Sequence, residues 1–195
     1  MFLESICILN GIPQNPEAHR ERMCLTAAHH GFTVPLLPHP SALLPPHLTH
    51  GKVKWRILYD SKIELMEFLP YRPKEVRSLR LVEASPDYAY KYADRTALET
   101  LLQQKGNCDE ILIVRDGQIT DTSYSNVVLQ QNDRYYTPSS FLLNGTKRQQ
   151  LLRERRVSEK EIRAEELHRY DRILLINAML DIDDAQSIPI SHIYG

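Results

Sequence analysis

The chain has 195 residues, of which 42% are hydrophobic and 25% charged, a balance typical of a globular protein with one large domain or two small ones. Its formal net charge of −1 provides no basic field for nucleic acid, and no apolar run approaches the roughly 20 residues of a membrane span. Three cysteines without paired spacing, and an N-terminus without a signal-peptide pattern, lead us to expect a reduced, cytoplasmic protein.

Residues 1–82 predict a small N-terminal α/β domain. Its first strand is expected to end at the Asn10-Gly11 turn. The following helix is expected to begin after Asn15 as its cap and to stop at Gly31. A proline-rich loop then leads to three further strands. The strands are predicted at 3–9, 52–59, 62–68 and 75–82, and the helix at 16–30.

Residues 83–90 are predicted to be a linker, and residues 91–195 a larger C-terminal domain. A helix over 91–105 follows from the spacing of its apolar residues and from Gly106 at its end. A second helix over 147–156 is expected to be capped by Thr146. The remaining segments predict strands at 111–114, 119, 127–129, 135–136 and 172–176.

The eight histidines do not predict a metal site. His29 and His30 are adjacent, whereas His39, His47 and His50 lie in the proline-rich loop. No His-Glu-x-x-His or Cys-x-x-Cys pattern accompanies them, and these are the spacings that would place ligands around one ion.

A lysine, a carboxylate and a helix start follow one another in the second half of the chain. Lys91 comes first, Asp121 lies thirty residues later, and 145–148 has the sequence Gly-Thr-Lys-Arg. A lysine can hold an aldehyde cofactor as a Schiff base, and a carboxylate can keep a pyridine nitrogen protonated. A helix N-terminus favours a phosphate. Together, in this order, the three features indicate a site for pyridoxal 5′-phosphate (PLP).

The sequence resembles the class IV aminotransferases, also called PLP fold type IV, which include D-amino-acid and branched-chain aminotransferases and aminodeoxychorismate lyase. The likeness spans nearly the whole chain, although it is thin over 31–90. The family motifs that it matches are Leu3-Glu4-Ser5-Ile6, His19 through Met23, Lys91 through Arg95, Asp121 through Asn126, Thr137-Pro138, Gly145 through Arg148, and Asn177-Ala178-Met179.

The resemblance implies an α+β protein with two α/β domains of the D-amino-acid aminotransferase-like fold and a compact N-terminal domain. It implies PLP as cofactor, a small-molecule amino substrate and a homodimer. Lys91 would form the Schiff base and move the Cα proton, and Asp121 would pair with the pyridine nitrogen, where most relatives have Glu. The other implied cofactor-binding residues are Arg22, Asn126, Gly145, Thr146 and Lys147, with Arg22, Thr146 and Lys147 at the phosphate.

Arg56 and Arg95 are candidates for binding substrate carboxylates, because a guanidinium offers a two-pronged fork of donors. The segments 91–95 and 177–179 look more like the lyase branch of the family, which favours a 4-amino-4-deoxychorismate lyase that forms 4-aminobenzoate and pyruvate. A class IV aminotransferase of the D-amino-acid or branched-chain type is the alternative. A PLP-binding protein without turnover is the second alternative.

Overall fold

The computed structural model describes residues 1–183 and 187–195, which divide into two compact units. Unit 1 comprises 1–73 and 90–94, and unit 2 comprises 74–89 and 95–195. This division differs from the predicted one at two segments, because 74–82 belongs to unit 2 and 91–94 to unit 1. Within the described residues, no helix is long and apolar enough to cross a membrane.

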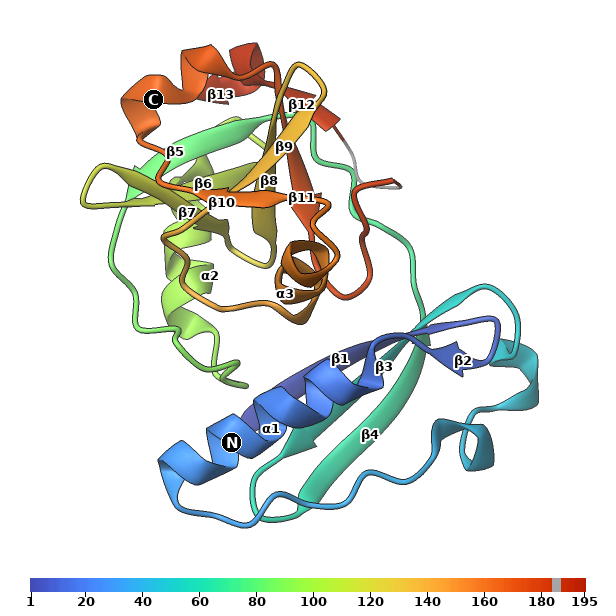
Figure 1. The fold of residues 1–195 in the computed structure, drawn as a ribbon. Helices are drawn as coiled ribbons and strands as arrows, with labels where there is room; N and C mark the ends of the chain where they lie inside the picture. Colours follow the sequence, from blue (N-terminus) through green and yellow to red (C-terminus); the bar gives the residue numbers. More distant parts are fainter. Residues whose placement is uncertain (184–186) are drawn as a thin grey trace. The chain divides into compact units, whose positions relative to one another are not determined.

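Unit 1 is a four-stranded antiparallel sheet in the order β2-β1-β3-β4, with helix α1 along one face (Figure 1). Alternate residues of β1 and β3 point to the helix and form the core with Met23, whereas their neighbours point to the other face. The elements are β1 Phe2–Leu9, β2 Ile12–Pro13, α1 Pro16–His30, β3 Lys52–Tyr59 and β4 Ile63–Pro70, with 3-10 turns at Pro40–Ala42 and Pro46–Leu48.

Residues 90–94 join unit 1 through backbone pairing with β1. Phe2 and Tyr92 form an antiparallel bridge, flanked by the Leu3 amide donating to the Lys91 carbonyl at 2.9 Å and the Ala93 amide donating to the Met1 carbonyl at 3.2 Å. These pairings occupy backbone groups that a helix would need. The predicted helix over 91–105 therefore starts only at Thr96, as α2 (Thr96–Leu102), and ends in a 3-10 turn at Gln103–Lys105.

Unit 2 contains a five-stranded sheet in the order β10-β9-β8-β11-β12 and a four-stranded sheet in the order β13-β5-β6-β7. Its strands are β5 Leu79–Glu83, β6 Glu110–Arg115, β7 Gln118–Thr122, β8 Asn126–Gln131, β9 Arg134–Pro138, β10 Ser158–Lys160, β11 Arg172–Ile176, β12 Ser187–Pro189 and β13 Ile193–Tyr194. Its helix α3 spans Thr146–Arg153, and 3-10 turns lie at Ala164–Arg169 and Ile190–His192.

The core of unit 2 lies between its two sheets. In β8, Val127 and Leu129 belong to this shared core, together with Leu112 of β6. Val128 points to the opposite face, where it packs with Leu151 of α3. Because β8 is apolar on both faces, it is an inner strand covered on both sides.

The segment 75–82, predicted as the fourth strand of the N-terminal domain, contains β5, which pairs in parallel with β6, Leu79 opposite Glu110. This pairing explains why 74–82 lies in unit 2. Helix α3 begins at Thr146, with Gly145 rather than Thr146 at the N-cap position. That difference matters for the candidate site, because Gly145 and Thr146 are both predicted cofactor-binding residues.

Candidate active site

Unit 1 buries a carboxylate, Glu4, beneath helix α1. The Arg22 guanidinium donates to both Glu4 oxygens, from Nε at 2.8 Å and from Nη2 at 2.6 Å. His19 Nδ1 lies 2.7 Å from Glu4 Oε2. Burial alone would raise the pKa of Glu4, but the charge of Arg22 and the hydrogen bond from His19 outweigh it and hold that pKa well below its usual range. Glu4 is therefore a carboxylate that ties β1 to α1.

Lys91 belongs to the same unit and is held by the rings on either side of it. Tyr92 packs on Phe2 with ring centroids 5.6 Å apart, and Tyr90 stacks on His29 at 4.6 Å. Burial lowers the pKa of His19, and the charges of Arg22 and Lys91 lower it further. Unit 1 therefore contains two predicted site residues, with Arg22 bound to Glu4 and Lys91 in the segment that pairs with β1.

Unit 2 buries a second carboxylate, Asp121, at the end of β7. Its Oδ2 accepts hydrogen bonds from the backbone amides of Leu142 at 3.0 Å and Leu143 at 2.9 Å, and its Oδ1 accepts one from Asn126 Nδ2 at 2.8 Å. Within the described chain, these donors in contact with the carboxylate are all uncharged. Burial raises the pKa of Asp121 to about 6, although the three hydrogen bonds and the charge of Arg148 oppose the rise.

The predicted phosphate-binding helix start also lies in unit 2. Gly145 stands at the N-cap of α3 and Thr146 is buried behind it. The Lys147 ammonium bonds Asp181 Oδ2 at 2.6 Å and Gln150 Oε1 at 2.9 Å. The charge of Lys147 is therefore paired within unit 2, and what it can offer a phosphate is its backbone amide at the helix start.

The two candidate substrate arginines are found in different places. Arg56 pairs with Glu67 across β3 and β4 at 2.6 Å, on the sheet face opposite to Glu4, so unit 1 does not bring it together with Arg22. Arg95 lies in unit 2, where it donates to the Tyr88 hydroxyl at 3.2 Å and to the Ser123 carbonyl at 2.7 Å. Its position beside the 121–126 segment keeps it in the candidate site.

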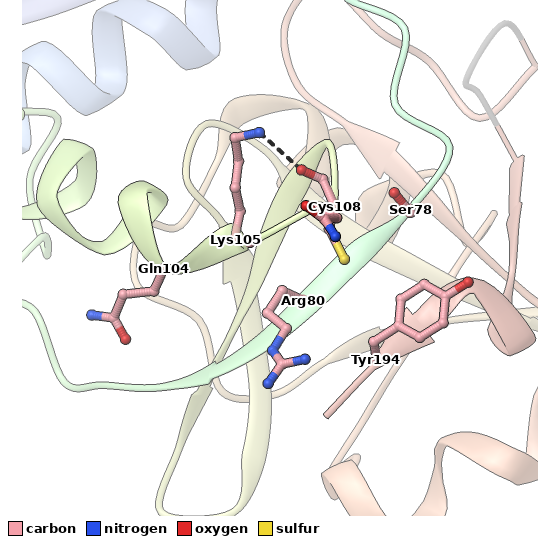
Figure 2. A pocket seen from close by; sticks show the side chains of 8 residues that line it. Ser78, Arg80, Gln104, Lys105, Cys108 and Tyr194 are labelled. Atoms are coloured by element: carbon pink, nitrogen blue, oxygen red, sulfur yellow. Dashed lines mark hydrogen bonds between the residues drawn. The ribbon is translucent and has the colours of Figure 1, made fainter.

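Neither the predicted absence of a metal site nor the surface groove of unit 2 involves the candidate site residues. His29 and His30 pack on Tyr90 as aromatic rings, and no group of three metal-ligating side chains occurs among the described residues. The groove, of about 600 Å³, runs between Arg80, Lys105, Cys108 and Tyr194, with Lys105 donating to the Cys108 carbonyl (Figure 2). It contains none of the predicted site residues.

The family model for class IV amino-transferases matches residues 69–188. The chain belongs to the class IV amino-transferase family. An uncharacterized protein of Haemophilus influenzae Rd is 34% identical over 182 residues, which cover 91% of this chain and 97% of that protein. This agreement over most of both chains confirms the resemblance and the fold class predicted from the sequence. Enzymes of this family use pyridoxal phosphate, which is the cofactor that the sequence predicted.

Solved structures agree with the family assignment. A Haemophilus somnus 129pt protein described as a "putative 4-amino-4-deoxychorismate lyase" is 34% identical, has a TM-score of 0.83, and is matched over 93% of this chain and 97% of its own. An aminotransferase from Brucella abortus bound to PLP is 19% identical with a TM-score of 0.72, over 96% of this chain and 79% of its own. The second likeness shows the fold alone.

The residues present fit the cofactor. Asp121 is a buried carboxylate whose hydrogen-bond donors are all neutral, so a protonated pyridine nitrogen would pair with it directly and add to the charge of Arg148. Arg22 is a guanidinium whose orientation is fixed by Glu4, and the start of α3 presents backbone N–H groups. Sequence reasoning noted Glu4 only as part of the Leu3–Ile6 motif and gave it no role, and it gave the amides of Leu142 and Leu143 none, because backbone donors leave no local pattern.

Replacing Glu4 by Gln tests whether Arg22 and His19 stabilise the buried Glu4 carboxylate. We expect the free energy of unfolding to fall by about 3 kcal/mol at pH 7, since the variant leaves Arg22 without its buried counter-ion. Because the folded pKa of Glu4 is lowered, its contribution is complete above its ordinary value of 4.5 and is lost as the pH falls. The difference from wild type should therefore shrink by about 1.4 kcal/mol per pH unit below that value.

Urea unfolding at pH 7, 4.5 and 3.5 measures both effects. Glu17→Gln, an exposed change on the same helix, is the control and should leave the unfolding free energy within about 0.5 kcal/mol of wild type. A difference between wild type and Glu4→Gln that stays constant down to pH 3.5 would contradict the assignment of a lowered pKa to Glu4.

Proposed function

We propose that this chain is a PLP-dependent 4-amino-4-deoxychorismate lyase, which converts a small amino substrate into 4-aminobenzoate and pyruvate. The observation that carries the proposal is the buried Asp121 carboxylate, whose hydrogen-bond donors are all neutral and which a cationic ring nitrogen would pair with directly, in addition to the charge of Arg148. The lyase branch is supported by the segments 91–95 and 177–179 and by the likeness to the Haemophilus somnus protein. A homodimer, which the family implies, stays a prediction.

The residues of unit 1 supply the attachment point and a phosphate ligand. Lys91 would hold the cofactor aldehyde through Nζ, and the same amine would act as the base that takes the proton from the substrate Cα. Arg22 binds the phosphate. Glu4 occupies the Nε and Nη2 side of the Arg22 guanidinium, which fixes the plane of its donors.

The residues of unit 2 hold the ring and the other phosphate contacts. Asp121 keeps a proton on the pyridine nitrogen, which is what makes the bound cofactor a sink for the electron pair left when the Cα–H bond breaks. Gly145, Thr146 and Lys147 offer backbone N–H groups at the start of α3 to the phosphate. Arg95 binds a substrate carboxylate, and Arg56 is the weaker candidate because Glu67 already pairs with it.

A class IV aminotransferase is the alternative function. Proton removal by Lys91 and ring protonation by Asp121 serve both reactions equally. The lyase then breaks a bond at Cβ, whereas the aminotransferase moves the amino group to the cofactor. The family match supports the alternative to the same degree as it supports PLP binding.

Borohydride reduction tests the role of Lys91. We expect purified protein incubated with PLP to absorb in the visible range, and reduction to fix the cofactor on the peptide that contains Lys91, because only an imine is reduced to a stable amine. Lys91→Arg should abolish the labelling. Lys62→Arg, a change of an exposed lysine, is the control and should label normally. Label found on a different lysine would disprove the assignment.

Replacing Arg22 by Lys tests the phosphate contact while leaving a cation beside Glu4. We expect the dissociation constant of PLP to rise by about 10-fold, because an ammonium cannot reproduce the fork of the guanidinium. The affinity for pyridoxal, which lacks the phosphate, should stay the same. Arg20→Lys, an exposed change on α1, is the control. Equal weakening of PLP and pyridoxal would remove Arg22 from the phosphate site.

A direct comparison of reactions decides between lyase and aminotransferase. We expect pyruvate release from aminodeoxychorismate to be faster than amino transfer from any member of a panel of L- and D-amino acids. Lys91→Arg is the control and should lose both activities. Robust amino transfer without detectable pyruvate release would reverse the order of the two functions and leave PLP binding intact.

A further inference from the structure

Both N–H groups of the Asn126 amide are used inside unit 2. Nδ2 donates to Asp121 Oδ1 and to the Leu143 carbonyl, each at 2.8 Å. A carboxylate and a carbonyl can only accept, so the amide orientation is fixed: turned by 180°, its oxygen would face two other acceptors. Asn126 therefore contacts Asp121 as a donor in one defined orientation.

The oxygen of the same amide lies against Gly145. A Cβ built on Gly145 would lie 2.0 Å from Asn126 Oδ1, far inside van der Waals contact. Gly145 has φ −66° and ψ 145°, values that any residue can adopt. The backbone does not require glycine at this position. What requires it is the space that the Asn126 amide occupies.

The loop 142–145 joins these contacts into one hydrogen-bonded ring. Its amides at Leu142 and Leu143 bind Asp121 Oδ2, its Leu143 carbonyl accepts from Asn126, and it leads directly into α3. A displacement of the Asn126 amide would therefore remove a donor from Asp121 and alter the loop at the same time.

We propose that Asn126 is a positioning residue for Asp121, and that Gly145 is glycine in order to admit the Asn126 amide. Asn126 acts through the carboxylate, by directing Oδ1 and by favouring its ionised form, and not as a ligand of the cofactor. The inference rests on the proposed function in so far as Asp121 meets the pyridine nitrogen. It corrects the expectation that Asn126 itself binds the cofactor.

The physical reason is that Asp121 is buried with few donors. Each hydrogen bond donated to the carboxylate stabilises its charged form, and burial opposes that form. Deleting the Asn126 donor leaves the two backbone amides and the charge of Arg148 to stabilise the carboxylate. The carboxyl group should then hold its proton to a higher pH, and Oδ1 should lose its fixed direction.

The test uses the whole chain without cofactor, with ¹³C-labelled aspartate carboxyl groups followed by NMR from pH 4 to 9 and the Asp121 signal assigned with Asp121→Asn. In Asn126→Ala, the midpoint of the Asp121 titration should move up by about one pH unit. Gly145→Ala should move it in the same direction, although Gly145 does not touch Asp121, because the new methyl group displaces the amide. Gly145→Ala also keeps the test possible if Asn126→Ala does not fold.

Asn177→Ala is the matched control, since Asn177 Nδ2 donates to Ser125 Oγ at 2.9 Å and is not a partner of Asp121. Its Asp121 titration should equal that of wild type. An unchanged midpoint in folded Gly145→Ala, and in folded Asn126→Ala where it can be made, would overturn the inference. So would a shift of the same size in the control.

A PLP titration separates this inference from the proposed function. If wild type binds PLP, Asn126→Ala should raise its dissociation constant about 10-fold at pH 7 and leave the site of borohydride labelling at Lys91. A shifted Asp121 titration in a protein whose wild type binds no PLP would overturn the function and support the coupling of Asn126 to Asp121. An unshifted Asp121 titration in Asn126→Ala, together with normal PLP binding, would overturn the coupling of Asn126 to Asp121 and leave the proposed function intact.

Discussion

Burial of a carboxylate is the constraint on which both candidate half-sites depend. A carboxylate withdrawn from water must be matched by cations or by hydrogen-bond donors, or it takes up a proton. Glu4 is matched by the Arg22 guanidinium and by His19, so its pKa is low. The hydrogen-bond donors of Asp121 are all neutral, and its pKa is raised to about 6 although the charge of Arg148 opposes the rise. One carboxylate is therefore paired directly with a cation, whereas the other has no cation among its hydrogen-bond donors.

The same two carboxylates organise the chain around them. Glu4 fixes α1 to β1, and the edge of β1 carries the segment that contains Lys91. Asp121 fixes the loop 142–143, which determines where α3 begins. Residues distant in sequence are thus gathered within each unit by a small number of charge-assisted hydrogen bonds, which are the strong members of their class.

The sequence predicted elements whose signal is local and missed what depends on distant partners. Helix 16–30 and strands 52–59 and 172–176 were predicted with the bounds that the structure has, because periodicity and glycine or asparagine stops define them. Lys91 was assigned to a helix because its pairing with β1 leaves no trace in the local pattern. Glu4 looked like one polar residue in an apolar strand, and nothing near Gly145 revealed the approach of Asn126 from nineteen residues away.

The segment 121–126 links the chemistry of the cofactor to recognition of the substrate. Asp121 and Asn126 stand at its ends, and the Ser123 carbonyl between them accepts from Arg95 at 2.7 Å. Arg95 is therefore anchored to the same short turn that holds Asp121, the carboxylate proposed to bind the ring. In the proposed function, a shift of this turn would move the substrate ligand and the ring ligand together. Since lyase and aminotransferase would need the same ring ligand, the proposal leaves the choice between them to side chains that meet the substrate, and Arg95 is the proposed one whose position this turn sets.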